Sequence, residues 1–202
     1  MSGSERRLTW PRSLLLVCGH PCCFKSTITR HISFCYEVFA ISSNETGSVG
    51  KGYELSYDEE RRIRYENLFR ITEAVLQSDL PLVVDGTFKN RAERERLCVL
   101  CRQYNYDMLV LFCYSSNLDV ILRRFAYRQS HPYGPDHGAS TIQIYEDVVA
   151  RFVPVIREEY MCFAAYAEID SATKDLTIRH SGSEQWTKLL REVEENFKRL
   201  HW

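Results

Sequence analysis

Short apolar runs recur along the chain and alternate with amphipathic stretches. Three of them, at residues 14–18 (LLLVC), 82–84 (LVV) and 108–114 (MLVLFCY), contain no charged residue and no polar alternation. Runs of this kind are typical of strands that are buried on both faces of a parallel sheet. Weaker runs predict further strands at residues 38–41, 167–169 and 176–178.

Between these runs the apolar residues recur at helical spacing. One face of a long helix that begins near residue 57 is predicted to carry Tyr65, Leu68, Phe69, Thr72, Val75 and Leu76. Similar patterns predict helices at residues 90–104, at residues 118–129 and from about residue 183 to the end. Asn90 and Asn117 stand where N-caps are expected. Strands alternating with helices predict an α/β sandwich with right-handed crossovers.

Composition and charge narrow the class of protein. The chain has 202 residues, of which 45% are hydrophobic and 26% charged, so we expect one globular domain over residues 1–202. A net charge of −1 argues against a protein that coats nucleic acid or an anionic membrane, although a local basic cleft remains compatible with it. No run approaches the roughly 18 apolar residues that span a bilayer. We therefore expect a cytoplasmic protein whose eight cysteines are reduced.

The segment 14–32 carries the most informative motif. The first strand runs into Gly19, and after four residues the sequence reads Phe24-Lys25-Ser26-Thr27 before a helical pattern begins. A Walker A motif has a second glycine where this chain has Phe24, and the rest of the pattern is met. In such a loop, backbone N–H groups wrap a polyphosphate, the lysine reaches its terminal phosphates and the first hydroxyl ligates Mg²⁺.

The alternative is a strand-to-helix turn that contains Lys-Ser-Thr by chance. The strand before the motif and the helix after it favour the phosphate loop. Phe24 adds a side chain where the backbone approaches the phosphates, so we expect a negative φ and a ring that points away from the ligand.

A second feature follows the strand at residues 82–84, which ends in Asp85-Gly86-Thr87. In open parallel sheets, ligands bind beyond the carboxyl ends of the strands, where an acid holds Mg²⁺ directly or through water. An isolated aspartate at this position would more simply cap the turn. Together with Lys25 and Ser26, the catalytic interpretation of Asp85 is favoured.

The order of these blocks resembles the P-loop kinases of the zeta-toxin and polynucleotide-kinase-like type, the AAA_33 predicted kinases. The resemblance runs through GHPCCFKST, VVDGTFKNRAERERL, MLVLFCY, LDVILRRFAYR and STIQIYEDVVARFVP, and so covers most of residues 14–170. It implies a three-layer P-loop NTPase sandwich with a mostly parallel sheet and a short helical lid at about residues 123–140. It also implies an enzyme that transfers the γ-phosphoryl group of ATP to a hydroxyl, with Mg²⁺ as cofactor.

The resemblance gives individual residues their roles. Lys25, Ser26 and Thr27 match the family's phosphate- and Mg²⁺-binding residues, and Asp85 matches its Walker B-like acid. Ser26 and Asp85 would therefore hold the metal, with Lys25 and Asp85 both counted as catalytic. The expected nucleotide-binding residues are Gly19, Cys22, Cys23, Phe24, Lys25, Ser26, Thr27 and Arg124.

Arginines complete the expected machinery. Arg91 or Arg94 lies where the family has an arginine after its Asp-x-Thr segment, and Arg124 and Arg128, spaced i and i+4, match the lid arginines. Arginine suits phosphoryl transfer because its guanidinium is planar and always charged. Without the resemblance, a solvated helix face would be the simpler interpretation of Arg124 and Arg128.

The acceptor base departs from the family pattern. The family usually has an aspartate just after the second strand, whereas residues 41–45 read ISSNE and place Asn44 there. An amide cannot act as a general base. Either Glu45 substitutes and Asn44 orients the acceptor, or the protein binds nucleotide but transfers phosphate poorly. The glycines at 47, 50 and 52 around Lys51 predict a flexible acceptor-side loop.

Other candidate sites have simpler interpretations. Cys98-x-x-Cys101 lacks a second metal-binding pair and fits two buried helix cysteines better than zinc. His131 and His137 fit polar loop residues better than metal ligands or acid–base groups. Cys22 and Cys23 lie near a helix N-terminus, so we expect reactive thiolates that ATP protects from alkylation.

The sequence thus predicts a kinase for an unidentified acceptor, which is a small molecule, a nucleotide or a nucleic-acid end. The near-neutral charge disfavours long nucleic acid, and no membrane partner is expected. Two alternatives stay open, a nucleotide-binding regulatory protein with degenerate catalysis and a simple NTP hydrolase. The oligomeric state is not predicted.

Overall fold

A central six-stranded sheet organises the computed structural model, which describes residues 10–47, 55–131 and 141–200. The strands are β1 (Ser13–Gly19), β2 (Phe39–Ser42), β3 (Leu82–Asp85), β4 (Asp107–Tyr114), β5 (Ala165–Asp170) and β6 (Leu176–Ser181). Their order across the sheet is β2-β3-β1-β4-β5-β6, and β6 runs antiparallel to β5 while all other pairs are parallel. Every strand that the apolar runs predict is therefore confirmed.

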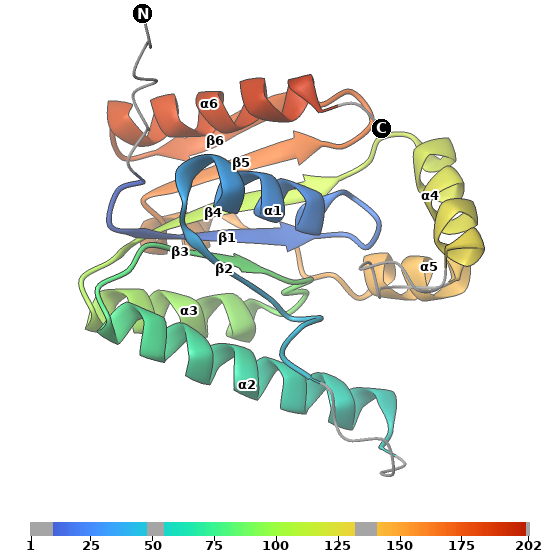
Figure 1. Cartoon of the computed structure of the whole chain (residues 1–202), viewed down its shortest axis with the longest axis horizontal. Coiled ribbons are helices and arrows are strands. Elements are labelled where there is room, and N and C mark those ends of the chain that lie inside the picture. The colour runs from blue at the N-terminus through green and yellow to red at the C-terminus, as the bar shows by residue number, and fades with distance from the viewer. Residues whose placement is uncertain (1–9, 48–54, 132–140, 201–202) are drawn as a thin grey trace, which may run out of the picture.

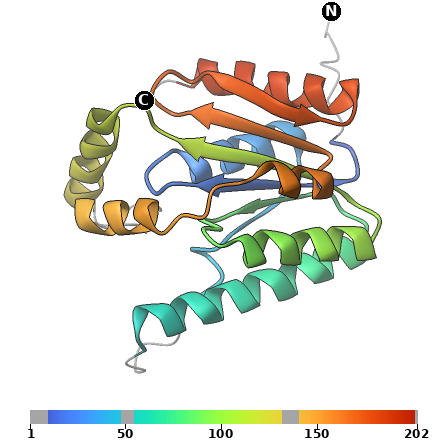
Figure 2. The same cartoon turned by 180° about the vertical axis from the view of Figure 1, so that it is seen from behind.

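Helices cover both faces of the sheet (Figure 1). They are α1 (Lys25–Tyr36), α2 (Tyr57–Gln77), α3 (Arg91–Gln103), α4 (Leu118–Ser130), α5 (Ile142–Ala150) and α6 (Glu184–Arg199), with a 3₁₀ turn η1 at Arg157–Cys162. α1 and α6 lie on one face and α2 and α3 on the other, while α4 and α5 stand beyond the carboxyl ends of the parallel strands (Figures 1 and 2). This arrangement is a three-layer α/β sandwich, and it confirms the predicted fold class.

The core is split in two by the sheet. Because successive side chains of a strand point to opposite faces, Leu15 and Val17 of β1 pack with α1 and α6, whereas Leu14 and Leu16 pack with α2 and α3. All four side chains are fully buried. This two-sided burial explains why β1 is apolar along its whole length.

The predicted apolar face of α2 is also confirmed. The six residues predicted for that face are all buried: Tyr65, Leu68, Phe69, Thr72, Val75 and Leu76. Asn90 and Asn117 are the N-cap residues of α3 and α4, and the Asn117 side chain accepts a hydrogen bond from the backbone N–H of Asp119.

The register of the sheet brings distant segments to one edge. Asp85, the last residue of β3, lies beside Val17 of β1 on one side and beside Ser42 of β2 on the other. The loops that follow β1, β2 and β3 therefore meet at the carboxyl edge, where α4 also stands (Figure 1). Parallel pairing makes this edge the expected place for a ligand.

Some predicted features fall outside the described residues. These are the second half of the lid, His137, and the loop residues Gly50, Lys51 and Gly52. No helix within the described ranges has both the length and the apolar character needed to cross a membrane.

Candidate active site

The loop between β1 and α1 begins at a glycine that no other residue could replace without rearrangement. Gly19 has a φ of +125°, and a Cβ on it would lie 2.1 Å from the carbonyl oxygen of Cys113 on the neighbouring strand β4. Its N–H donates to the carbonyl of Thr87 at 3.2 Å, and the next N–H, of His20, donates to Cys113 at 3.0 Å. The start of the loop is thus held by β4 and by the turn after β3.

Phe24 does not keep the negative φ that the sequence led us to expect. Phe24 has φ 60° and ψ 14°, the left-handed conformation that a glycine adopts without penalty. The expectation of a negative φ is therefore wrong. The ring is 7% exposed and belongs to the core beneath the loop, where its centroid lies 6.4 Å from that of Phe197 on α6. The left-handed backbone costs roughly 1–2 kcal/mol, and burial of the ring offsets it.

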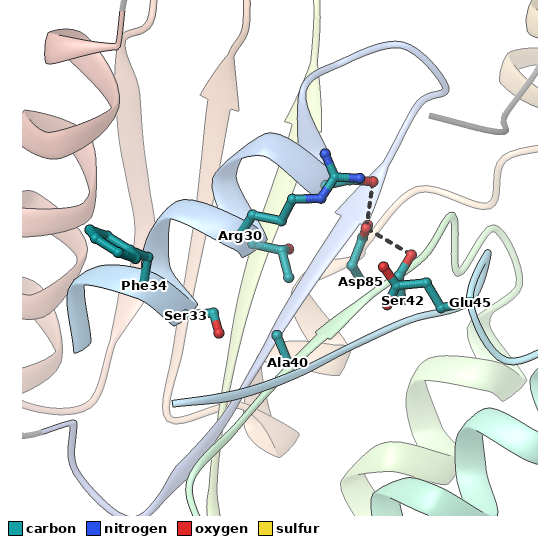
Figure 3. Close-up of a pocket in the computed structure, with 9 residues that line it drawn as sticks. Arg30, Ser33, Phe34, Ala40, Ser42, Glu45 and Asp85 are labelled. Atoms are coloured by element: carbon teal, nitrogen blue, oxygen red, sulfur yellow. Dashed lines mark hydrogen bonds between the residues drawn. The ribbon is translucent and has the colours of Figure 1, made fainter. Parts of the chain in front are cut away.

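Polar groups from α1, β2 and β3 meet where the loop enters α1, and Figure 3 shows Ser42 beside Asp85. The Ser26 hydroxyl donates to Oδ2 of Asp85 at 2.7 Å, and the Ser42 hydroxyl donates to the same oxygen at 3.1 Å. Lys25 Nζ donates to the carbonyl of His20 at 2.6 Å, so the ammonium lies folded back over the loop. The cation, the hydroxyl and the carboxylate predicted for phosphate and metal are therefore brought to one place. Thr27 follows in the first turn of α1 and is half-buried.

Burial controls the ionisation of Asp85. The side chain is 2% exposed, and its burial raises its pKa, while the charge of Lys25 and the hydrogen bonds from Ser26 and Ser42 act in the opposite direction. Oxygen ligands such as a carboxylate and a hydroxyl are those that Mg²⁺ accepts. The Ser26–Asp85 pair therefore fits a divalent cation, which would favour the ionised carboxylate.

His20 joins the loop to an aromatic cluster that the sequence did not reveal. Its ring lies edge-on to Phe112 of β4, to Phe152 and to Tyr145 of α5, with centroids 5.3, 5.5 and 6.4 Å away. Burial, aided by the charge of Lys25, lowers the pKa of His20 to about 4, so the imidazole is neutral at physiological pH. These partners lie far from His20 along the chain, so a local sequence pattern does not predict the contacts.

Arg124 and Arg128 of α4 lie against the loop rather than on a solvated face. The guanidinium carbon of Arg124 is 3.4 Å from the centroid of the Phe24 ring, a cation–π contact. One turn later, Arg128 Nη1 donates to the sulfur of Cys22 at 3.1 Å. Both side chains are half-buried. The first part of the predicted lid therefore contacts the phosphate loop through the two arginines that the resemblance named.

The acceptor side is formed by the segment after β2. A cavity of about 330 Å³ lies between α1 and β2 and reaches Ser26 and Asp85 at the carboxyl edge (Figure 3). Glu45 lines this cavity, whereas Asn44 is not among its lining residues; the Asn44 N–H donates to the Ser42 hydroxyl at 3.3 Å. Of the two candidates for proton transfer, Glu45 is the one whose side chain can reach a ligand beside Ser26.

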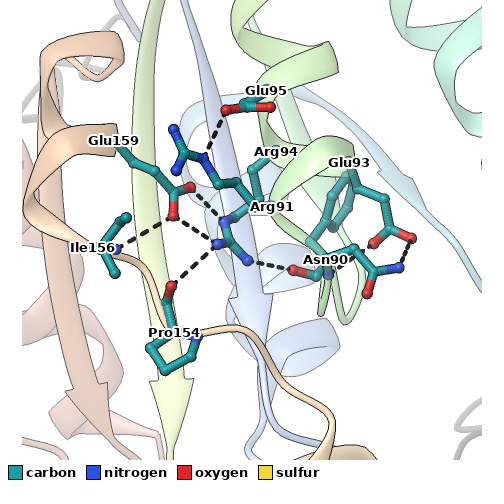
Figure 4. A network of polar contacts seen from close by, with 9 residues as sticks. Asn90, Arg91, Glu93, Arg94, Glu95, Pro154, Ile156 and Glu159 are labelled. Atoms are coloured by element: carbon teal, nitrogen blue, oxygen red, sulfur yellow. Dashed lines mark hydrogen bonds and ion pairs between the residues drawn. The ribbon is translucent and has the colours of Figure 1, made fainter.

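The structure places Arg91 and Arg94 elsewhere than at the phosphates (Figure 4). Arg94 is fully buried and forms two 2.8 Å hydrogen bonds with the Glu159 carboxylate, and it also donates to the carbonyls of Phe88 at 3.0 Å and Pro154 at 3.4 Å. Arg91 is exposed and pairs with Glu95 at 2.7 Å. Arg94 thus connects α3 to η1 and to the segment after α5. An arginine this deep in the core serves the packing of these elements.

The loop cysteines are more deeply buried than their position in the sequence suggested. Cys22 and Cys23 are 4% and 0% exposed, and burial raises the pKa of Cys23 to about 11. For Cys23, desolvation therefore opposes the thiolate that the helix N-terminus would favour, and the reactivity of the two cysteines stays a prediction. All eight cysteines lie among the described residues, and Cys35 on α1 is the exposed one.

The remaining candidates keep their simpler interpretations. Cys98 and Cys101 are buried in α3, and among the described residues no three His, Cys, Asp or Glu side chains are grouped as for a metal. His131 is exposed and stacks on Tyr127, with ring centroids 4.3 Å apart.

Comparisons with known proteins agree with this geometry. Residues 14–152, more than half of the chain, match the AAA_33 family, described as an AAA domain. The chain belongs to this family. No curated protein matches the chain significantly.

Solved structures show the same fold at low sequence identity. The PezAT toxin–antitoxin system of Streptococcus pneumoniae matches with a TM-score of 0.63 and 12% identity, over 96% of this chain and 90% of that chain. Kti12 of Chaetomium thermophilum, in complex with ADP-AlF3, matches with a TM-score of 0.57 and 15% identity, over 92% of this chain and 97% of that chain. A gluconokinase of Sinorhizobium meliloti matches with a TM-score of 0.51 and 18% identity, over 93% of each chain. Family and fold thus confirm the resemblance to P-loop kinases.

The strain at Phe24 can be measured by comparing two truncations. Phe24→Ala and Phe24→Gly both lose the buried ring, and each should lower the free energy of unfolding by roughly 3 kcal/mol or more. Because the backbone is left-handed, the glycine variant should be more stable than the alanine variant by about 1 kcal/mol. Urea unfolding of both variants checks this. At Phe34, an 85% exposed residue of α1, the same pair should show the reverse order. An alanine variant as stable as the glycine variant at position 24 would contradict the assigned backbone.

The Arg94–Glu159 pair predicts a second stability effect. Arg94→Ala leaves a carboxylate buried without its partner and should cost about 3–5 kcal/mol in urea unfolding. Replacing both residues together, as Arg94→Met with Glu159→Leu, should recover most of that loss. The double variant should also keep its affinity for Mg–ATP, since neither side chain is assigned to the nucleotide. A loss below about 1 kcal/mol in Arg94→Ala would show that the pair is not closed in solution.

Thiol labelling distinguishes buried from exposed cysteines. With a limiting amount of iodoacetamide at neutral pH, Cys35 should be modified at least about tenfold faster than Cys22 and Cys23. Peptide mass spectrometry with and without ATP measures the three rates. Fast modification of Cys22 or Cys23 in the folded protein, suppressed by ATP, would restore the original expectation.

Proposed function

We propose that this protein is an ATP- and Mg²⁺-dependent kinase that transfers the γ-phosphoryl group to a hydroxyl of its acceptor. The observation that carries the proposal is the 2.7 Å contact between the Ser26 hydroxyl and Asp85, next to Lys25 and open to the cavity between α1 and β2. A structural turn would need neither a buried carboxylate nor a cavity at this position. The match to the kinase-like fold supports the same reaction class.

The residues of this chain divide the chemistry between them. In the proposal, loop N–H groups and Lys25 bind the phosphates, and Ser26 with Asp85 would hold Mg²⁺, which would supply charge neutralisation at the phosphates. The acceptor hydroxyl attacks the γ-phosphorus and gives its proton to the Glu45 carboxylate, while the bond to the β–γ bridging oxygen breaks and ADP leaves. Arg124 and Arg128 lie at the loop, where their charge can balance that of the transferring group.

Two other functions are separated by the same assays. A regulatory protein with degenerate catalysis would bind Mg–ATP without turnover, as Asn44 and Phe24 could suggest, and an NTP hydrolase would release phosphate without any acceptor. The kinase proposal requires phosphate transfer to an acceptor. If Glu45→Gln retains full phosphate transfer, Glu45 is not the base.

The eight cysteines are all free, which supports a reducing compartment such as the cytoplasm.

Asp85→Asn should separate metal chemistry from stability. The amide oxygen can still accept the hydrogen bonds from Ser26 and Ser42. Because the amide is a poorer ligand for Mg²⁺ than the carboxylate, the substitution should lower the Mg²⁺-dependent rate of phosphate transfer about 100-fold or more. At neutral pH the variant should be more stable than the wild type in the absence of nucleotide, because it removes a buried charge.

Lys25→Ala, in parallel, should weaken Mg–ATP binding about tenfold or more in calorimetry.

The pH dependence follows from the raised pKa of Asp85. Burial penalises the ionised carboxylate, so its cost is fully present above the folded-state pKa and disappears as pH falls toward the ordinary value of 3.8. The stability advantage of Asp85→Asn should therefore shrink over the same interval, which urea unfolding at several pH values measures. An advantage that is constant with pH, or unchanged Mg²⁺ dependence of the rate, would exclude this role for Asp85. Unchanged ATP affinity in Lys25→Ala would show that the loop does not bind phosphates.

A further inference from the structure

One face of α1 lines the cavity with polar side chains. Ser26, Thr29, Arg30 and Ser33 are spaced i, i+3, i+4 and i+7, so they form a stripe along the helix, and all four line the cavity. Ser26 belongs to the proposed metal pair, whereas the other three have no part in nucleotide binding as described above. The stripe thus leads away from the phosphate loop along the acceptor side.

Thr29 is the most telling residue of this stripe. Its side chain lines the cavity and is 3% exposed, and its Oγ1 is buried without a hydrogen-bond partner among the described residues. A helical threonine can donate to the carbonyl four residues earlier, and a buried hydroxyl nearly always has a partner. Because Oγ1 itself has almost no accessible surface, a rotation about χ1 is needed to turn it to the cavity, where a polar group of a bound ligand would satisfy it.

Charge indicates what kind of ligand fits. Among the lining residues Arg30 is the cation, and Asp85 and Glu45 are the acids. Arg30 extends from α1 across the cavity toward the end where Asp85 lies, while Phe34 is at the other end (Figure 3). A ligand that places an anionic group on Arg30 and a hydroxyl beside Glu45 would complement both charges.

Size restricts the ligand further. A volume of about 330 Å³ is at the lower end of the range for small-molecule sites. It is too small to enclose an oligonucleotide. Of the acceptor classes that the sequence left open, the cavity favours the small molecule.

Building on the kinase function proposed above, we propose that this cavity binds the acceptor, a small polyhydroxy compound that carries one carboxylate or phosphate group. Arg30 pairs with the anionic group, the Thr29 hydroxyl hydrogen-bonds to the ligand after rotation about χ1, and the reacting hydroxyl faces Glu45 and the metal pair. Thr29 and Arg30 are therefore specificity residues for the acceptor. They are not ligands of ATP.

Matched probe molecules test the charge requirement. Titration calorimetry, with and without Mg–AMP-PNP, compares D-glycerate and glycerol 3-phosphate with glycerol, and D-gluconate with D-glucitol. At least one acid should bind about tenfold or more tightly than its neutral partner. Carboxylate and phosphate probes are separate arms, so their relative affinities show which anion the site prefers.

Two variants test the residues, with Arg199→Gln, an exposed arginine of α6 that does not line the cavity, as the matched surface control. Thr29→Val and Arg30→Gln should each weaken binding of the preferred acid about tenfold and leave Mg–AMP-PNP affinity within about twofold. Thr29→Val should unfold at the same or a higher temperature, because it removes an unsatisfied buried hydroxyl. A residue of purely structural importance would not combine gained stability with lost acceptor affinity.

The outcomes distinguish this inference from the proposed function. If Mg–AMP-PNP binds but no acid binds better than its neutral partner, the acceptor assignment is wrong and the kinase proposal stands. If Arg30→Gln weakens nucleotide rather than acid binding, Arg30 serves the γ-phosphate and the assignment is again wrong. If the wild type does not bind Mg–AMP-PNP, the kinase proposal fails, and titration of the acids alone still decides whether the cavity selects anions.

Discussion

The buried carboxylate of Asp85 is the group on which the candidate site depends. It ends β3, accepts hydrogen bonds from Ser26 at the start of α1 and from Ser42 at the end of β2, and lies 98% buried. Parallel pairing brings these strand ends together, and the two hydroxyls keep an otherwise costly acid in place. An apolar side chain at this position would hold the same strands at lower cost. The acid is therefore better explained by chemistry than by stability.

The phosphate loop carries its own cost, which the surrounding side chains offset. Cys22 and Phe24 both have φ near 60°, where non-glycine residues are strained. The Phe24 ring is held from two sides, by the core around α6 and by the guanidinium of Arg124. Strain that persists only because its neighbours enforce it is common at ligand sites. In this protein the same phenylalanine that strains the loop also gives α4 a contact surface.

The local sequence pattern was sufficient to predict features that depend on a single helix or strand. Apolar runs, three of them uninterrupted and three weaker, predicted all the strands, and helical spacing predicted the buried face of α2 from Tyr65 to Leu76. It was insufficient where distant segments decide. Arg94 looked available for phosphate because Glu159, its partner, is 65 residues away. Cys23 looked reactive because the helix N-terminus is visible in the sequence, whereas the burial that raises its pKa is not.

The candidate site shows the same division. Lys25, Ser26 and Asp85 were predicted from motif spacing, and the structure brings them together, although their roles stay a proposal. The φ of Phe24 was mispredicted because a clash argument assumed that the chain would avoid strain. His20 was missed because its aromatic partners come from β4, α5 and the segment that follows. The polar spacing of Thr29, Arg30 and Ser33 was visible, but only the cavity gives it meaning.

Helix α1 links the two halves of the proposed reaction. Its first turn carries Lys25 and Ser26, and its next turns carry Thr29, Arg30 and Ser33 on the face that lines the cavity. With a rise of about 1.5 Å per residue, Ser26 and Ser33 are about 10 Å apart along the helix axis. A rigid helix thus fixes how far the polar lining of the cavity extends from the metal pair. It holds the acceptor-side residues in a constant position relative to Lys25 and Ser26, and positioning of this kind is most of what phosphoryl transfer asks of a protein.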